Sequence, residues 1–233
     1  MMRIAQLLWM RMSKYGVSKY RERKNKMRKN VKKYIPLDED FMKRSMSDLL
    51  FAYIQINSYK DKNGIWFCYK PRDFFSKAKE SLGIKSVNTI KNKYENLLDG
   101  NYIQEGEVVG LSGEVINAII IPVKTNYFEK VDIKILELLA HTTKENTVKI
   151  YSYLLNKNRI YKGEYIFTYK ELIQNCLGNK NGGHQNSLKE VKLVLELLVR
   201  LKLIEFKTVR QKETFRQKLI SVATKLPELQ QKI

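Results

Sequence analysis

The same succession of patterns occurs twice along this 233-residue chain, and it constrains the fold more strongly than any other feature. In the first copy, helical periodicity over residues 73–82 ends at Gly83, a residue type common at helix C-termini. Ser86 then caps a second predicted helix, whose apolar residues recur at intervals of three and four. Residues 102–123 predict two strands around a loop that contains Gly106 and two further glycines.

The second copy follows the same plan with a longer turn. Residues 169–177 predict a short helix that ends at Gly178, and a glycine-rich stretch separates it from an amphipathic helix after Asn186. Residues 203–206 and 218–222 flank a polar stretch, as the strands of a hairpin do. Because the order of elements recurs, we expect weak internal symmetry.

Further elements precede each copy. The predicted helices cover residues 41–56, 131–140 and 147–156, and short β-rich runs cover residues 65–69 and 165–168. Both halves of the chain therefore begin with helical segments and a short strand before the repeated pattern.

A helix, a glycine turn, a second amphipathic helix and a hairpin together form a winged helix-turn-helix, so we expect a mainly helical α+β protein. The second helix of such a unit fits the major groove of DNA, and the hairpin, called the wing, lies against the adjacent backbone. The predicted organisation is a basic N-terminal arm over residues 1–36, winged-helix domain 1 over 37–124 and winged-helix domain 2 over 127–226.

The charge of the chain points to a polyanionic partner. Its 44 Lys and Arg exceed its 24 Asp and Glu by 20, and nucleic acid is the first partner to expect for so basic a protein. The arm is rich in basic residues and poor in apolar ones, so we expect it to track phosphates or enter a minor groove. The alternative is a solvated tail. The expected contacts of the arm are Arg21, Arg23, Lys24, Lys26 and Arg28.

Polar donors suited to bases and phosphates lie opposite the apolar stripes of the two second helices. The expected DNA contacts of the first unit are Lys85, Ser86, Asn88, Thr89, Lys91, Asn92 and Lys93. Those of the second unit are His184, Gln185, Asn186, Ser187, Lys189 and Lys192, with Lys207, Arg210, Lys212 and Arg216 on its wing. The alternative is that these residues only solvate a surface helix. The first wing is acidic, with Glu105, Glu107 and Glu114, so domain 1 is also a candidate for contact with protein.

Signals for catalysis are weak. The two histidines, His141 and His184, are too far apart in sequence for a His-x-His metal site, and no phosphate-binding glycine loop is present. Most of the 14 tyrosines, such as Tyr94 and Tyr151, lie on apolar faces and are better interpreted as core than as nicking nucleophiles. We therefore expect no enzyme activity, no cofactor and no metal.

The sequence also limits the expected location. It has no run of about eighteen apolar residues, the length that a membrane span needs, and no signal-peptide cleavage pattern follows Met10. Cys68 and Cys176 are far apart and form neither a disulfide framework nor a metal-type pair. We expect a cytoplasmic protein without a membrane partner.

Five segments of the first half carry a family resemblance: Tyr34–Leu37, Asp48–Tyr53, Asn63–Phe67, Leu82–Gly83 and Asn96–Ile103. Together they are similar to the N-terminal winged-helix region of replication initiator proteins from AT-rich plasmids and related phages. This resemblance implies binding to repeated origin sequences in double-stranded DNA, local opening of the duplex and recruitment of host replication proteins. A second copy of the chain, in a homodimer, is a further candidate partner.

The same fold and charge suit other functions, because winged helices serve many roles. A transcriptional regulator of a mobile element is the first alternative, and a DNA-nicking enzyme, either a relaxase or a nuclease, is the second. The sequence leaves open the target site, the oligomeric state, the translation start, and whether domain 1 binds DNA or protein.

Overall fold

The computed structural model describes most of the chain after the arm. The described residues are 32–44, 46–60, 64–109, 115–122, 128–141, 144–178, 185–211 and 214–227. Lys32–Ile233 form one compact unit, and the five arm residues expected to bind DNA lie outside the described residues.

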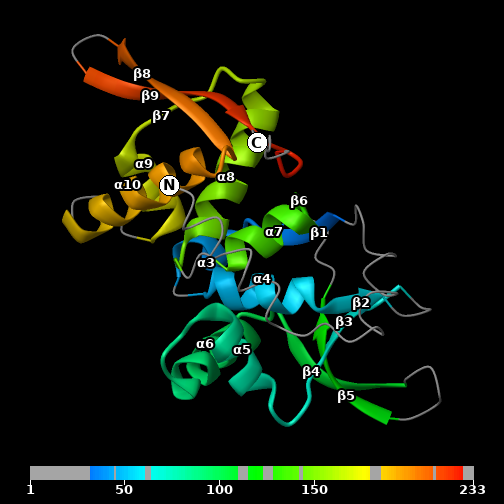
Figure 1. Cartoon of the computed structure of the whole chain (residues 1–233). Helices are drawn as coiled ribbons and strands as arrows, with labels where there is room; N and C mark the ends of the chain where they lie inside the picture. The colour runs from blue at the N-terminus through cyan, green and yellow to red at the C-terminus, as the bar shows by residue number, and fades with distance from the viewer. Residues whose placement is uncertain are drawn as a thin grey trace, which may run out of the picture. The chain divides into compact units, whose positions relative to one another are not determined.

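The described residues form an α+β fold with eight helices and three small antiparallel sheets (Figure 1). The first half contains β1 (Lys32–Pro36), α3 (Glu39–Lys43), α4 (Asp48–Ile56), β2 (Ser58–Lys60), β3 (Trp66–Tyr69), α5 (Phe74–Leu82), α6 (Val87–Asp99), β4 (Gln104–Val109) and β5 (Val115–Ile121). The second half contains β6 (Phe128–Asp132), α7 (Ile133–Ala140), α8 (Thr147–Tyr161), β7 (Ile166–Phe167), α9 (Tyr169–Cys176), α10 (Gln185–Arg200), β8 (Ile204–Gln211) and β9 (Thr214–Val222).

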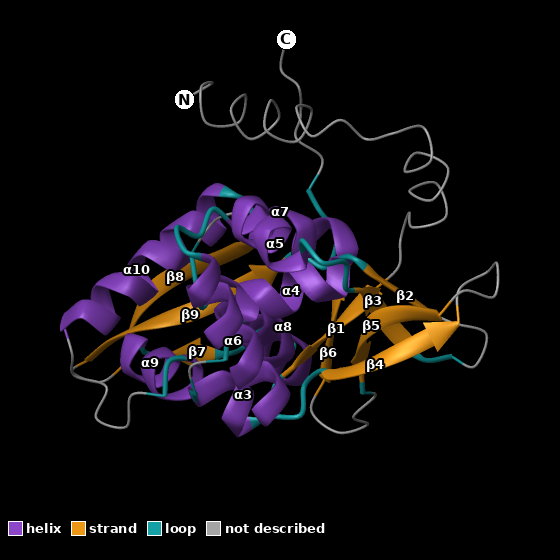
Figure 2. Cartoon of the chain, turned by 90° about the horizontal axis from the view of Figure 1, so that it is seen from below, coloured by secondary structure: helices purple, strands orange, loops and turns teal. Residues whose placement is uncertain are grey.

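The two halves share one topology. In the first half the strands are ordered β2-β3-β5-β4, and in the second half they are ordered β7-β9-β8. Without the additional strand β2, the first order matches the second strand for strand. The leading strands β1 and β6 pair with each other in antiparallel register, with Lys32 opposite Asp132 and Pro36 opposite Phe128. In Figures 1 and 2 the two larger sheets lie at opposite ends of this unit, with helices between them.

Local capping explains where the helices of the repeated pattern begin and end. The Ser86 hydroxyl accepts the backbone N–H of Asn88 at the start of α6, and the Thr168 hydroxyl accepts that of Glu171 at the start of α9. Gly83 ends α5 with a φ of 65°, a left-handed conformation that costs glycine little. The sequence predictions for α5, α6, α9 and both hairpins are therefore confirmed at the level of secondary structure.

The structure differs from the predictions for one helix and one loop of the first half. The helix expected over residues 41–56 is two helices, because Arg44 leaves the helical conformation and the Ser47 side chain caps a new helix by accepting the N–H of Leu50. Gly106 lies inside β4, opposite Ala118, rather than in the loop between the strands. A Cβ at that position would meet the Ile120 side chain, so the glycine serves close packing across the ladder.

The end of the predicted arm belongs to the folded unit. Residues 32–36 form β1, and Lys33 is buried, with its Nζ 3.1 Å from the carbonyl oxygen of Ser58 and 3.8 Å from the centre of the Trp66 ring. The Trp66 ring therefore packs against a buried cation. Lys33 is therefore a structural lysine, although the sequence groups it with the basic arm.

The core is continuous between the halves. Buried apolar side chains from α3, α4, α5 and α6 join those from α7, α8, α9 and α10 in a single cluster. In the described part of the chain, no helix is both long and apolar enough to cross a membrane.

Candidate nucleic-acid interface

Helix α6 presents most of its expected DNA contacts to solvent. It buries Ile90, Tyr94 and Leu97 against the first-half core, which turns the opposite side of the helix outward. The exposed residues on this side are Lys85, Ser86, Asn88, Thr89, Lys91 and Asn92. Of these, Ser86 already uses its hydroxyl to cap the helix, so the remaining Lys, Asn and Thr side chains are the available donors.

Lys93 differs from the other expected contacts of α6. Its Nζ lies 2.8 Å from Glu145 Oε1, and its side chain is only 23% exposed. The ion pair joins the two halves of the chain, since Glu145 lies in the turn before α8. Lys93 is therefore engaged inside the protein, and this could not be predicted from local patterns because its partner is 52 residues away.

Helix α10 shows the same arrangement in the second half. It buries Val191, Val194, Leu195 and Leu198, and its outer side starts at the N-terminus of the helix. Gln185, Asn186, Lys189 and Lys192 are exposed there, Ser187 is half-buried, and His184 lies outside the described residues. Lys192 Nζ also lies 5.5 Å from the centre of the Tyr169 ring on α9.

The second hairpin is basic. Lys207, Arg210 and Arg216 are exposed, and Lys212 lies outside the described residues. Lys218, opposite Lys207 in the ladder, is paired with Glu164 at 2.6 Å and so contributes less free charge. Sequence reasoning missed Phe215, which is 73% exposed and lies opposite Arg210.

The first hairpin is acidic. Glu107 of β4 is exposed, and Glu105 forms an ion pair with Lys70, which follows β3. This neighbouring ammonium group lowers the pKa of Glu105, and the Tyr94 hydroxyl donates to the same carboxylate over 3.0 Å. Glu114 lies outside the described residues. Among the described residues of β4 and β5 there is no basic side chain to meet a phosphate.

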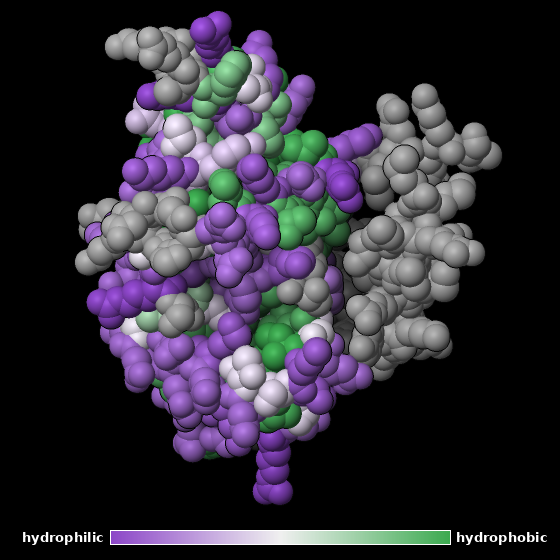
Figure 3. Space-filling view, turned by 90° about the vertical axis from the view of Figure 1, so that its left-hand side faces the viewer, coloured by the Kyte–Doolittle hydropathy of each residue, from purple (hydrophilic) through white to green (hydrophobic). Residues whose placement is uncertain are grey.

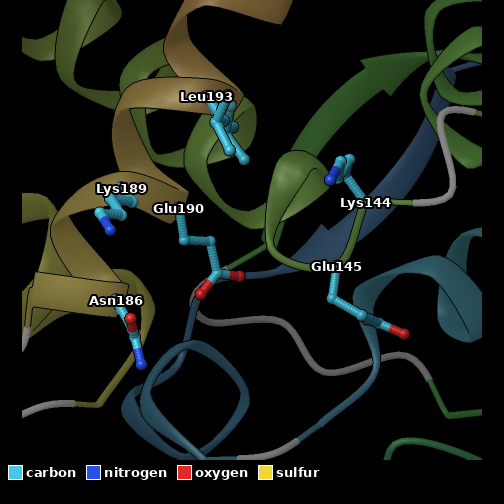
Figure 4. Close-up of a pocket in the computed structure, with 7 residues that line it drawn as sticks. Lys144, Glu145, Asn186, Lys189, Glu190 and Leu193 are labelled. Atoms are coloured by element: carbon cyan, nitrogen blue, oxygen red, sulfur yellow. The ribbon is translucent and has the colours of Figure 1, made fainter.

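The two candidate helices border one turn. Lys93 of α6 contacts Glu145, and Asn146 Nδ2 donates to Glu190 of α10 over 2.8 Å. Figure 4 shows a pocket of about 290 Å³ that is lined by residues of this turn and of α10, among them Glu145 and Glu190. The side of the unit that carries α6 and α10 is largely hydrophilic, with apolar side chains in separate patches (Figure 3).

Metal ligands and tyrosines are the groups on which the sequence-based expectation about catalysis depends. They contain no group of three or more His, Cys, Asp or Glu side chains able to hold a metal ion. Tyr94 and Tyr151 are buried, and burial raises the pKa of both hydroxyls, which disfavours the phenolate form of each.

Comparison with known proteins found no family model, curated protein or solved structure that matches the chain. The candidate interface is therefore defined by its own geometry: two exposed polar helix faces, one basic hairpin and one turn that joins the helices.

Proposed function

We propose that the protein binds double-stranded DNA at specific sequences through two winged helix-turn-helix domains, and that it is a plasmid or phage replication initiator. One observation carries this proposal: the same helix–turn–helix–hairpin topology occurs twice, and in each copy the second helix exposes Lys and amide side chains to solvent. The net charge of +20 supports a polyanionic partner. The role in replication rests on the family resemblance of the first half.

In this proposal α6 and α10 enter major grooves of one duplex. Asn side chains suit adenine, and Lys side chains suit guanine and phosphate. The second wing follows the backbone with Lys207, Arg210 and Arg216. In this proposal the first wing does not contact DNA, because phosphate would repel the carboxylates of Glu105 and Glu107. The first wing is instead the surface that binds a host replication protein or a second copy of the chain.

Replacement of a base-contacting residue should weaken specific binding alone. We expect Asn88→Ala or Lys91→Ala to cost about 1–3 kcal/mol on the cognate site and much less on bulk DNA. Lys134→Ala on α7 is the matched control for Lys91→Ala, because it removes the same positive charge from an exposed position outside the candidate interface. Fluorescence anisotropy with cognate and scrambled duplexes measures both affinities. An equal loss on the two duplexes would assign these residues to phosphate contact.

Deletion of the arm should weaken binding to all DNA about equally. The slope of log affinity against log salt is negative, and each lost phosphate contact reduces its magnitude by about 0.9. A truncated protein that begins at Lys32 keeps β1 and its pairing with β6 intact. Titrations at several salt concentrations give the slope directly. An unchanged slope and unchanged non-specific affinity would show that the arm is a solvated tail.

Footprinting on the DNA of its own replicon, in competition with bulk genomic DNA, tests the function. Protection of repeated sites in an AT-rich noncoding region supports an initiator, whereas protection of a single promoter supports the regulator of a mobile element. Metal-dependent nicking of supercoiled DNA would instead indicate a relaxase or nuclease. Uniform, salt-sensitive coating without a footprint would contradict sequence-specific binding.

A further inference from the structure

The turn Glu145–Asn146 contacts both candidate recognition helices. Glu145 Oε1 accepts a hydrogen bond from Lys93 Nζ of α6 over 2.8 Å. The next residue, Asn146, donates from Nδ2 to Glu190 Oε1 of α10, also over 2.8 Å. Because the two contacts come from adjacent residues, α6 and α10 cannot move apart without breaking at least one of them.

The start of α4 holds this turn in place. Asp48 Oδ1 accepts the backbone N–H of Asn146 over 2.9 Å, and Oδ2 accepts those of Val148 and Lys149 over 2.8 and 3.1 Å. Asn146 has a φ of 67° and caps α8 without a side-chain hydrogen bond. The carboxyl group of a residue from the other half of the chain therefore satisfies the first turn of α8.

The contacts between the start of α4 and the start of α8, called the junction below, are buried. Asp48 is fully buried and Lys149 is 2% exposed, and Lys149 Nζ donates to the carbonyl oxygen of Arg44 over 3.1 Å. Removing one partner from a buried polar cluster leaves an unpaired group whose burial is costly. A displaced junction would leave several such groups unpaired, so these contacts favour one relative placement of the halves over others.

We propose that Glu145 and Asn146 are positioning residues, which fix α6 relative to α10 and thereby set the spacing at which the protein reads two patches of bases on one duplex. Two reading helices at a fixed separation impose a fixed number of base pairs between their sites. The consequence for DNA rests on the proposed function, whereas the coupling of the helices is a property of the protein alone.

The double variant Lys93→Met/Asn146→Gly tests the coupling. It removes the contact of the turn with each candidate helix, Lys93–Glu145 on α6 and Asn146–Glu190 on α10, and leaves the hydrogen bonds from the Ser47 hydroxyl to Glu145 in place. The glycine tolerates the positive φ and keeps its backbone bond to Asp48. Spin labels at Glu95→Cys and Glu196→Cys, exposed on α6 and α10, report the distance between the helices, since both native cysteines are buried. We expect a single narrow distance distribution in the labelled parent and a broader one in the double variant.

The effect on DNA is measured on the footprinted duplex and on copies with one, two or five base pairs inserted between the two protected halves. Two added base pairs should weaken the parent protein by about tenfold, because the second half-site rotates away from its helix. The double variant should lose much of this discrimination. Lys91→Met removes the same charge from an exposed position of α6 and should weaken binding without changing the dependence on spacing.

Two results would overturn the proposal: the same narrow distance distribution in parent and double variant, or an unchanged dependence on spacing. If the protein shows no sequence-specific footprint, the proposed function fails, and the distance measurement alone decides whether the turn couples the helices.

Discussion

Gly178→Ala should lower the free energy of unfolding by about 2–5 kcal/mol. Gly178 follows α9 with a φ of 71°, a conformation that costs an L-residue about 1–2 kcal/mol. A Cβ at this position would also overlap the backbone carbonyl of Lys43 at the end of α3, in the other half of the chain. Backbone cannot move aside as a flexible side chain does, so the clash adds to the strain.

Gly163→Ala is the matched control for this prediction. Its φ of 83° imposes a similar backbone strain, but its Cβ would meet only the Ile220 carbonyl oxygen at an ordinary distance of 3.7 Å. We expect a loss of about 1–2 kcal/mol for this variant. Urea unfolding measures both values. Equal losses would show that α3 and the end of α9 do not approach each other as closely as the structure places them.

The stability of the protein should depend on pH through Asp48. Burial and the nearby charge of Glu145 raise the pKa of this carboxyl to about 7, from an ordinary value of 3.8. Between these two values the folded state keeps a proton that the unfolded state has lost. The stabilising contribution of protonated Asp48 is therefore complete below about pH 4 and is lost as the pH rises to about 7, a change of about 2–4 kcal/mol.

Asp48→Asn isolates this effect, because asparagine keeps the shape of the side chain and does not titrate. We expect the variant to be less stable than the parent at pH 4, since its amide nitrogen cannot accept a backbone N–H. Its stability should also change less between pH 4 and 7. Urea unfolding over this range gives both curves. Parallel curves would contradict the titration of Asp48.

The elements that sequence reasoning predicted correctly are those with a local cause. The glycines after α5 and α9, the Ser86 cap and the apolar spacing of α6 and α10 all act within a few residues. The strands β2 and β6 were missed, because their evidence lies in distant pairing partners. The break between α3 and α4 was missed although Ser47 and Asp48 form a capping signal, since the apolar periodicity continues through it.

The residues of the candidate site also differ in whether local patterns or distant partners determine their placement. Helical periodicity was enough to place Asn88, Lys91 and Lys189 on exposed faces, and their contact with DNA stays a prediction. The engagement of Lys93 and the burial of Lys33 depend on partners that only the folded chain brings near. The ion pair between Lys70 and Glu105 is a third case, because helices α5 and α6 separate the two residues in the sequence.

The pairing of β1 with β6 has a consequence for synthesis on the ribosome. Lys32 lies opposite Asp132, and Asp48 accepts hydrogen bonds from N–H groups that follow it by 98 to 101 residues. A nascent chain that ends near residue 124 lacks both partners. Its strand β1 has no β6 to pair with, and its Asp48 side chain has no N–H groups of α8 to accept. Contacts so distant in sequence close slowly, and the first half reaches its final structure only after α8 has been translated.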